Sequence, residues 1–114
     1  MHVLFNAIST TIGERSLGYY SDEMCRKGVT DSKEYLKVIL DKLKQKNMSI
    51  NNVSIMMEAA KPKLEKYTDK IKDSLSKILK LEKERIGIAY TSGEKLTAFG
   101  RGGGIQGFAV VTIN

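Results

Sequence analysis

The hydrophobic positions near the start of the chain predict a short helix followed by a loop. Helical spacing connects Val3, Leu4, Ala7 and Ile8. This pattern predicts a helix that ends before Gly13. Residues 13–30 have no clean period and include three glycines, so we expect a long loop there. Loops of that length in compact domains are often functional.

A second helix is predicted from Asp31 to about Asn47. Asp31 followed by Glu34 is typical of a helix start at which the two side chains cap the first turn. The apolar face of this helix consists of Leu36, Ile39, Leu40 and Leu43. The other face is rich in lysine, so we expect one buried side and one side in water.

The next segment predicts a strand, a third helix and two further strands. The strand is the run Val53, Ser54, Ile55, Met56 and Met57, with both methionines in its core and its end near Ala59 and Ala60. Pro62 suits the first turn of the helix that follows, because its missing N–H is not needed there. The helical stripe is Leu64, Tyr67, Ile71, Leu75, Ile78 and Leu79. Residues 85–91 and 107–114 predict the second and third strands.

This order of elements predicts a single α/β (α+β) domain over residues 1–114, with a small mixed sheet and helices on one face. The strand–helix–strand unit requires a right-handed crossover with parallel strands, and we expect the last strand to return antiparallel. Such a thin sheet has a bare face and exposed edges. We therefore expect an oligomer, with Phe99 and Phe108 as core or interface aromatics.

Composition narrows the function classes. Apolar residues make up 41% and charged residues 28% of the chain, which is typical of a folded soluble protein. The net charge of +6 comes mostly from dispersed lysines, a distribution more typical of solvated helix faces than of a nucleic-acid interface. The positive field would also favour a phosphorylated small ligand. Cys25 is the only cysteine, and neither an export signal nor a membrane span is visible. We expect a cytoplasmic protein.

The candidate chemistry lies between residues 91 and 108, "TSGEKLTAFGRGGGIQGF". Thr91 and Ser92 follow a strand end, where open α/β sheets bind ligands, and their hydroxyls suit phosphate oxygens. Glu94 could hold a divalent metal that bridges phosphates. The alternative is a capped turn with Glu94 exposed. Arg101 among glycines suits an anionic group, and the alternative there is a flexible hairpin turn.

Two runs of the sequence resemble the 2-C-methyl-D-erythritol 2,4-cyclodiphosphate synthase family. The family run V-K-A-T-T-T-E-x-L-G-F-T-G-R-x-E-G-I-A is similar to "IAYTSGEKLTAFGRGGGIQ", and N-V-D-V-T-I-I-A-Q-x-P-K-L is similar to "NVSIMMEAAKPKL". Weaker likeness extends to "MHVLFNAI", "IGER" and "KGVTDSKEYL". The resemblance covers nearly the whole chain, but the first forty or so residues of the family have no counterpart here.

The resemblance implies a homotrimer with sites between subunits, and it implies roles for individual residues. Phosphates would contact Thr91 and Ser92, the catalytic candidates. The nucleotide would contact Ala59, Pro62, Lys63 and Leu64, with Glu14 in place of the ribose-binding aspartate. A zinc ion would use His2, although the other two family ligands have no counterpart, and Glu94 would hold magnesium or manganese. Arg101 would lie near the threefold axis, at the isoprenoid-diphosphate channel, where Gly103 replaces a glutamate.

The activity implied by the resemblance is an intramolecular cyclisation in the non-mevalonate isoprenoid pathway. The 2-phosphate of a CDP-linked methylerythritol attacks the β-phosphate and expels CMP, which would make the enzyme a phosphorus–oxygen lyase. Such chemistry needs geometry and charge rather than a protein nucleophile. The alternative is a non-catalytic paralogue that binds a nucleotide or an isoprenoid diphosphate. A basic nucleic-acid module is a weaker alternative, because the lysine helices lack interleaved aromatics.

Overall fold

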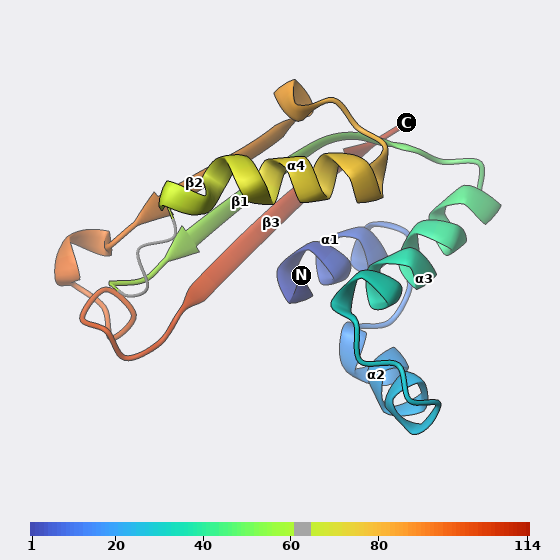
Figure 1. The fold of residues 1–114 in the computed structure, drawn as a ribbon, viewed down its shortest axis with the longest axis horizontal. Coiled ribbons are helices and arrows are strands. Elements are labelled where there is room, and N and C mark those ends of the chain that lie inside the picture. The colour runs from blue at the N-terminus through green and yellow to red at the C-terminus, as the bar shows by residue number, and fades with distance from the viewer. Residues whose placement is uncertain (61–64) are drawn as a thin grey trace.

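The computed structural model describes residues 1–60 and 65–114 and contains a three-stranded mixed sheet (Figure 1). The strands are β1 (Ile50–Glu58), β2 (Ile86–Thr91) and β3 (Gln106–Ile113), in the order β2-β1-β3. β1 pairs with β2 in parallel and with β3 antiparallel. Both expected orientations are therefore confirmed. The observed β1 begins three residues before the predicted Val53.

Three of the helices correspond to predicted ones. They are α1 (His2–Thr11), α3 (Ser32–Gln45) and α4 (Thr68–Leu79). The Asp31 carboxylate accepts a hydrogen bond from the Lys33 N–H at 2.9 Å, which confirms Asp31 as the cap of α3. The Glu34 carboxylate pairs with Lys37 and does not cap the first turn. A 3-10 turn, Glu65–Tyr67, precedes α4. The predicted position of Pro62 in the first helical turn lies outside the described residues.

The expectation of a long loop over residues 13–30 is wrong, because the segment contains α2 (Leu17–Arg26). The N–H of Leu17, in the first turn of α2, donates to the Asn6 side-chain oxygen at 2.9 Å. Leu17 is buried, and Tyr20 and Met24 pack against the core on the same side. The helix is therefore capped by a residue of α1, a contact that no local sequence pattern reveals.

α1 and α4 cover one face of the sheet, and α2 packs on α1 and α3 (Figure 1). α1 packs on β3, α4 packs on β2, and α3 packs on α1. The core beneath them is formed by Leu4, Phe5, Ile8, Leu17, Tyr35, Leu36, Ile39, Leu43, Ile50, Val53, Ile55, Leu81, Ile86 and Val111. None of the described helices combines the length and the apolar character that crossing a membrane requires.

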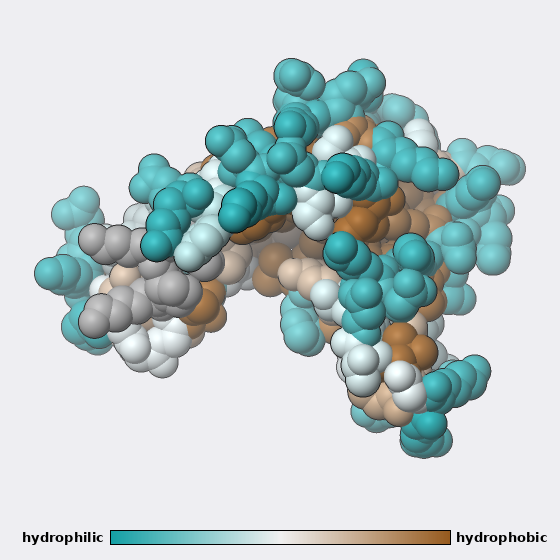
Figure 2. Space-filling model, viewed as in Figure 1, coloured by the Kyte–Doolittle hydropathy of each residue, from teal (hydrophilic) through white to brown (hydrophobic). Residues whose placement is uncertain are grey.

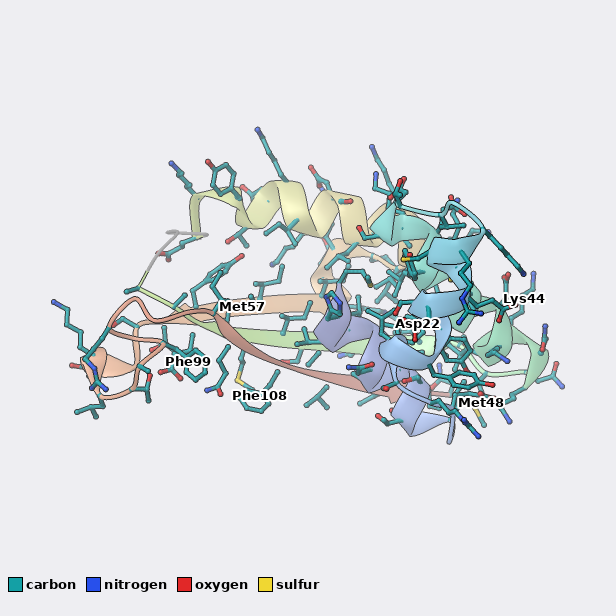
Figure 3. The ribbon with its side chains drawn as sticks, turned by 90° about the horizontal axis from the view of Figure 1, so that it is seen from below. Asp22, Lys44, Met48, Met57, Phe99 and Phe108 are labelled. Carbon is teal, nitrogen blue, oxygen red and sulfur yellow. The ribbon has the colours of Figure 1, made fainter. Side chains whose placement is uncertain are left out.

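The opposite face of the sheet is open, as expected for a thin sheet. Met56 and Phe108 are direct partners across β1 and β3 and are 49% and 59% exposed, and Val110 is 58% exposed. Figure 3 shows Phe108 on this side and Met57 on the helix side. Assigning Met56 to the core was wrong, because strand alternation places it on the uncovered face with Phe108, which is not a core aromatic either.

Candidate functional site at the carboxyl ends of the parallel strands

The ends of β1 and β2 bring two predicted site segments together. Glu58 and Thr91, the last residues of these strands, are register partners. One residue further, the Ala59 N–H donates to the Thr91 carbonyl at 3.0 Å. The structure thus places Ala59 beside Thr91, although they are distant in sequence. Pro62, Lys63 and Leu64, the other predicted nucleotide contacts from this segment, lie outside the described residues.

Thr91 and Ser92 present hydroxyls at the start of the connection to β3. The Thr91 Oγ1 accepts a hydrogen bond from the Gly93 N–H at 2.9 Å, so its own proton points elsewhere. Both side chains are exposed. This geometry contains the capped turn that was the alternative interpretation, and it also leaves the Thr91 and Ser92 hydroxyls accessible to solvent. An anion bound here would meet O–H groups at the end of a parallel strand pair.

Glu94 and Lys95 both have left-handed backbone conformations, with φ of 56° and 62°. Such angles are uncommon for residues other than glycine and persist where the surroundings hold the chain. Glu94 is exposed, and in residues 1–60 and 65–114 its carboxylate has neither an ion pair nor a hydrogen bond. It is thus available to a cation or to solvent.

Glu58 ties this segment to the sheet, and sequence reasoning missed it. Its carboxylate accepts hydrogen bonds from the Thr97 hydroxyl and from the Gln106 Nε2, the latter at 3.3 Å. It also lies against Gly93, where an added Cβ would be 2.6 Å from the Glu58 Oε1. The available signal was a carboxylate at the end of an otherwise largely apolar strand. The quoted family run has isoleucine at this position.

The glycine run forms a compact turn rather than a hairpin. β2 and β3 lie on opposite sides of β1, so no hairpin joins them. Backbone N–H groups of Arg101, Gly102 and Gly103 donate to carbonyls three to five residues earlier, at 2.7–3.2 Å. A Cβ on Gly100 would lie 2.0 Å from the Ser92 carbonyl oxygen. Glycine is therefore required there for close packing of the chain on itself.

Arg101 lies on the outer side of this turn. The side chain is exposed, and its Nη1 donates to the Lys95 carbonyl at 3.2 Å. This bond uses part of the five-donor guanidinium and leaves the rest accessible to an anion. Arg101 and Lys95 thus add two positive charges to the segment that carries Thr91 and Ser92.

His2 is exposed at the start of α1 and lines a cavity of about 380 Å³ on the helix side of the sheet. The cavity is bounded by Met1, His2, Val3, Ile55, Met57, Ile71, Ile88, Tyr90, Ile105 and Gly107. The Tyr90 hydroxyl is buried without a hydrogen-bond partner among the described residues. Apart from His2 and this hydroxyl, the side chains that line the cavity are apolar. Tyr90 directly precedes Thr91 in the sequence, so the cavity lies near the candidate site.

The expected metal ligands are not assembled into a centre by the described part of the chain. Over residues 1–60 and 65–114, the histidine, cysteine, aspartate and glutamate side chains form no group of three or more that could hold a metal ion. Zinc sites require three or four such ligands. Within the described residues His2 therefore does not make a zinc site by itself.

Glu14 interacts within the helical part of the molecule. Its Oε2 accepts from the Tyr20 hydroxyl at 2.7 Å and lies 4.0 Å from the Lys42 Nζ. Burial, followed by the bond to Glu14 and its negative charge, raises the pKa of Tyr20. These described contacts do not join Glu14 to Ala59 or Thr91. Within one chain Glu14 thus lies apart from Thr91, and its expected nucleotide role stays a prediction.

Comparisons with known proteins place these features in context. The model of the YgbB family matches residues 1–114. The 2-C-methyl-D-erythritol 2,4-cyclodiphosphate synthase of Chlamydia muridarum is 34% identical over 113 residues, which are 98% of this chain and 63% of that protein. This chain therefore spans less than two thirds of that relative.

Solved structures show the same fold. A structure of 2C-methyl-D-erythritol-2,4-cyclodiphosphate synthase matches with a TM-score of 0.86 and 25% identity, covering 99% of this chain and 73% of the other. A form of that enzyme bound to CDP matches with a TM-score of 0.84 and 24% identity, over 99% and 73% of the two chains. The resemblance drawn from the sequence motifs is confirmed.

Proposed function

This chain belongs to the YgbB family, and from that premise we propose that it is a cyclodiphosphate synthase homologue that binds the diphosphate of a CDP-linked substrate. The observation that carries this proposal is the hydrogen bond between Ala59 and Thr91. It unites the expected nucleotide segment and the expected phosphate segment at one end of the sheet. The CDP-bound relative of the same fold supports this ligand class.

In this proposal the protein positions the phosphates. The exposed hydroxyls of Thr91 and Ser92 donate to phosphate oxygens, while Lys95 and Arg101 offset negative charge. The cytosine lies near Ala59, and Pro62, Lys63 and Leu64 are proposed to complete its pocket. Glu94 is proposed as the position for magnesium or manganese, and Arg101 also as a contact for an isoprenoid diphosphate.

The reaction proposed for this site is an intramolecular phosphoryl transfer. An oxygen of the 2-phosphate forms a bond to the β-phosphorus, and the bond from that phosphorus to the bridging oxygen breaks. CMP leaves with the electron pair of the broken bond. The residues of this chain hold the two phosphates in line and neutralise charge, which are the contributions that such a transfer requires.

We also propose that the chain forms a homotrimer that covers the open face of the sheet. Met56, Phe108 and Val110 form an exposed apolar strip on that face. Burial of such a strip is favourable, and subunit association is the common way to achieve it. Sedimentation equilibrium measures the mass directly. A monomer at micromolar concentration would contradict this part of the proposal.

The second candidate is a non-catalytic protein that keeps only the nucleotide site. It is favoured by the incomplete set of zinc donors around His2 in the described residues. Turnover of CDP-methylerythritol 2-phosphate, with zinc and magnesium added and CMP release followed, separates the candidates. CMP above a metal-only control identifies an enzyme. CDP binding by calorimetry without CMP release identifies the binding protein.

The placement of the phosphates is tested by a double substitution, Thr91→Ala with Ser92→Ala. We expect the affinity for CDP to fall about tenfold, because two donors to the diphosphate are lost. The matched control is Thr10→Ala with Thr11→Ala, two exposed hydroxyls at the end of α1. Equal affinities in the test variant and the unmodified protein would refute the placement.

A further inference from the structure

A groove lies between α3 and α4, away from the candidate site. Its volume is about 690 Å³, and one wall includes Ile50, where β1 begins. The candidate site is at the other end of that strand, beyond Glu58. Figure 3 shows Lys44 and Met48 at this end of the molecule and Phe99 at the opposite end.

The floor of the groove is apolar. Leu43 and Ile50 belong to the core, whereas Leu40, Ile78 and Leu79 are only partly buried. Met48 is 37% exposed at the edge. In Figure 2, apolar residues show between the hydrophilic residues that cover α3 and α4. A hollow of this volume falls within the range typical of small-molecule sites, about 300–1,000 Å³.

The rim of the groove is strongly basic. Lys33, Lys37 and Lys44 come from α3, and Lys77 and Lys80 come from the end of α4. Asp41 is the one acidic residue in this lining. Of the five lysines, only Lys37 has an ion pair within the described residues, with Glu34 at 3.0 Å. The sequence predicted only solvated lysine faces on the two helices. In the tertiary structure both of these faces border one apolar groove.

We propose that this groove binds an anionic amphiphile, with its apolar chain on the floor and its phosphate or carboxylate head among the lysines. Burial of an apolar chain and attraction of an anion are both favourable here. The floor lies below the lysine rim instead of protruding from the surface. This shape suits a single amphiphile molecule that is free in solution. It does not suit insertion of the protein into a bilayer, which requires protruding apolar groups.

Calorimetric titration of the full chain with decyl phosphate, below its micelle concentration, tests this proposal. The expected result is saturable binding of one molecule per chain. Inorganic phosphate and decanol should each bind at least about tenfold more weakly, because each provides only one half of the interaction. Equal affinity for inorganic phosphate would overturn the proposal, as would binding of phosphatidylglycerol vesicles without binding of decyl phosphate.

Matched charge variants locate the site. Lys33→Gln with Lys77→Gln removes two rim charges, and we expect about tenfold weaker binding of decyl phosphate. Lys66→Gln with Lys70→Gln removes two exposed charges outside the groove and should change the affinity less than about twofold. An equal loss of decyl phosphate affinity in both pairs of variants would show a general charge effect and would refute binding in the groove.

A change in the apolar floor gives an independent test. Met48→Asp places a carboxylate at the edge of the groove, and its native side chain is exposed enough for the variant to fold. Circular dichroism checks that fold. We expect decyl phosphate binding to be lost while CDP affinity is unchanged, since the two sites are at opposite ends of β1. Retained decyl phosphate binding, or capture of an acidic helical peptide in its place, would contradict the proposal.

Discussion

Two segments of this chain contain several glycines but use them differently in the structure. Residues 13–30 contain α2, with Gly13 after the end of α1 and Gly28 after the end of α2. These two glycines have φ of 74° and 80°, and an added Cβ would meet nothing within 4 Å. Residues 92–105 form a compact turn in which Gly100 touches another part of the backbone. Glycine thus ends an element in the first segment and permits close packing in the second.

The difference is also visible in the polar contacts. In the first segment, α2 begins at the Asn6 side-chain oxygen, and Cys25 and Val29 near its other end contact the Tyr35 hydroxyl of α3. The second is tied by the Glu58 carboxylate, which binds both Thr97 and Gln106. We therefore expect changes in residues 92–105 to affect both stability and ligand binding, and changes in residues 17–28 to affect stability alone.

The largest expected effect comes from Gly100→Ala. The added Cβ would lie 2.0 Å from the Ser92 carbonyl oxygen, so the turn must open. We expect a loss of about 3 kcal/mol or more in the free energy of unfolding, together with weaker CDP binding. Urea denaturation and calorimetry measure the two effects.

The matched control for Gly100→Ala is Gly28→Ala. Its Cβ meets nothing within 4 Å, and only the positive φ of 80° is unfavourable. We expect a cost of about 1 kcal/mol and unchanged CDP affinity. If both variants lost the same stability, the distinction between the two segments would disappear.

The next effect is expected for Glu58→Ala. The variant leaves the Thr97 hydroxyl and the Gln106 amide without their acceptor, which should cost about 2 kcal/mol and weaken CDP binding. Glu58→Gln retains one acceptor oxygen and should recover much of the affinity. The control Glu34→Ala removes an exposed ion pair with Lys37 and should change stability little. If Glu58→Ala left the CDP affinity unchanged, that result would argue against a positioning role for Glu58.

A smaller effect is expected for Asn6→Ala. It removes the acceptor for the Leu17 N–H, so α2 should fray and the protein should lose about 1 kcal/mol. Hydrogen exchange should show faster exchange in residues 17–26, with CDP affinity unchanged. The control is Asn52→Ala, at an exposed position on the sheet. Unaltered exchange in α2 would mean that the helix does not depend on this cap.

The smallest effect concerns Tyr20 and pH. The folded-state pKa of Tyr20 is raised, so its contribution to stability is fully present below the unfolded value of about 10 and is lost as pH rises through the folded pKa. Tyr20→Phe should cost about 0.5 kcal/mol at neutral pH. We expect this difference to shrink above pH 10 in denaturation curves. A constant difference up to pH 11 would refute the role of the Glu14 contact.

Patterns of neighbouring residues were sufficient for much of the fold. The spacing of Leu36, Ile39 and Leu43 predicted α3, and the alternation around Ile55 predicted β1. The strand–helix–strand order predicted the parallel pairing of β1 and β2, because a helical crossover returns the chain to the end of the sheet where the first strand began. The motif around Thr91 also pointed to the end of the sheet where the candidate site lies.

Side-chain partnerships between distant residues could not be predicted in this way. Asn6 caps a helix that begins 11 residues later, and Glu58 meets Thr97 and Gln106 at separations of 39 and 48 residues. The exposure of Met56 and the groove between α3 and α4 likewise depend on how complete elements pack. The sequence by itself determined the elements and their order, because periodicity and chirality act locally. Only the tertiary structure decided which polar groups meet, because that follows from the packing of the whole chain.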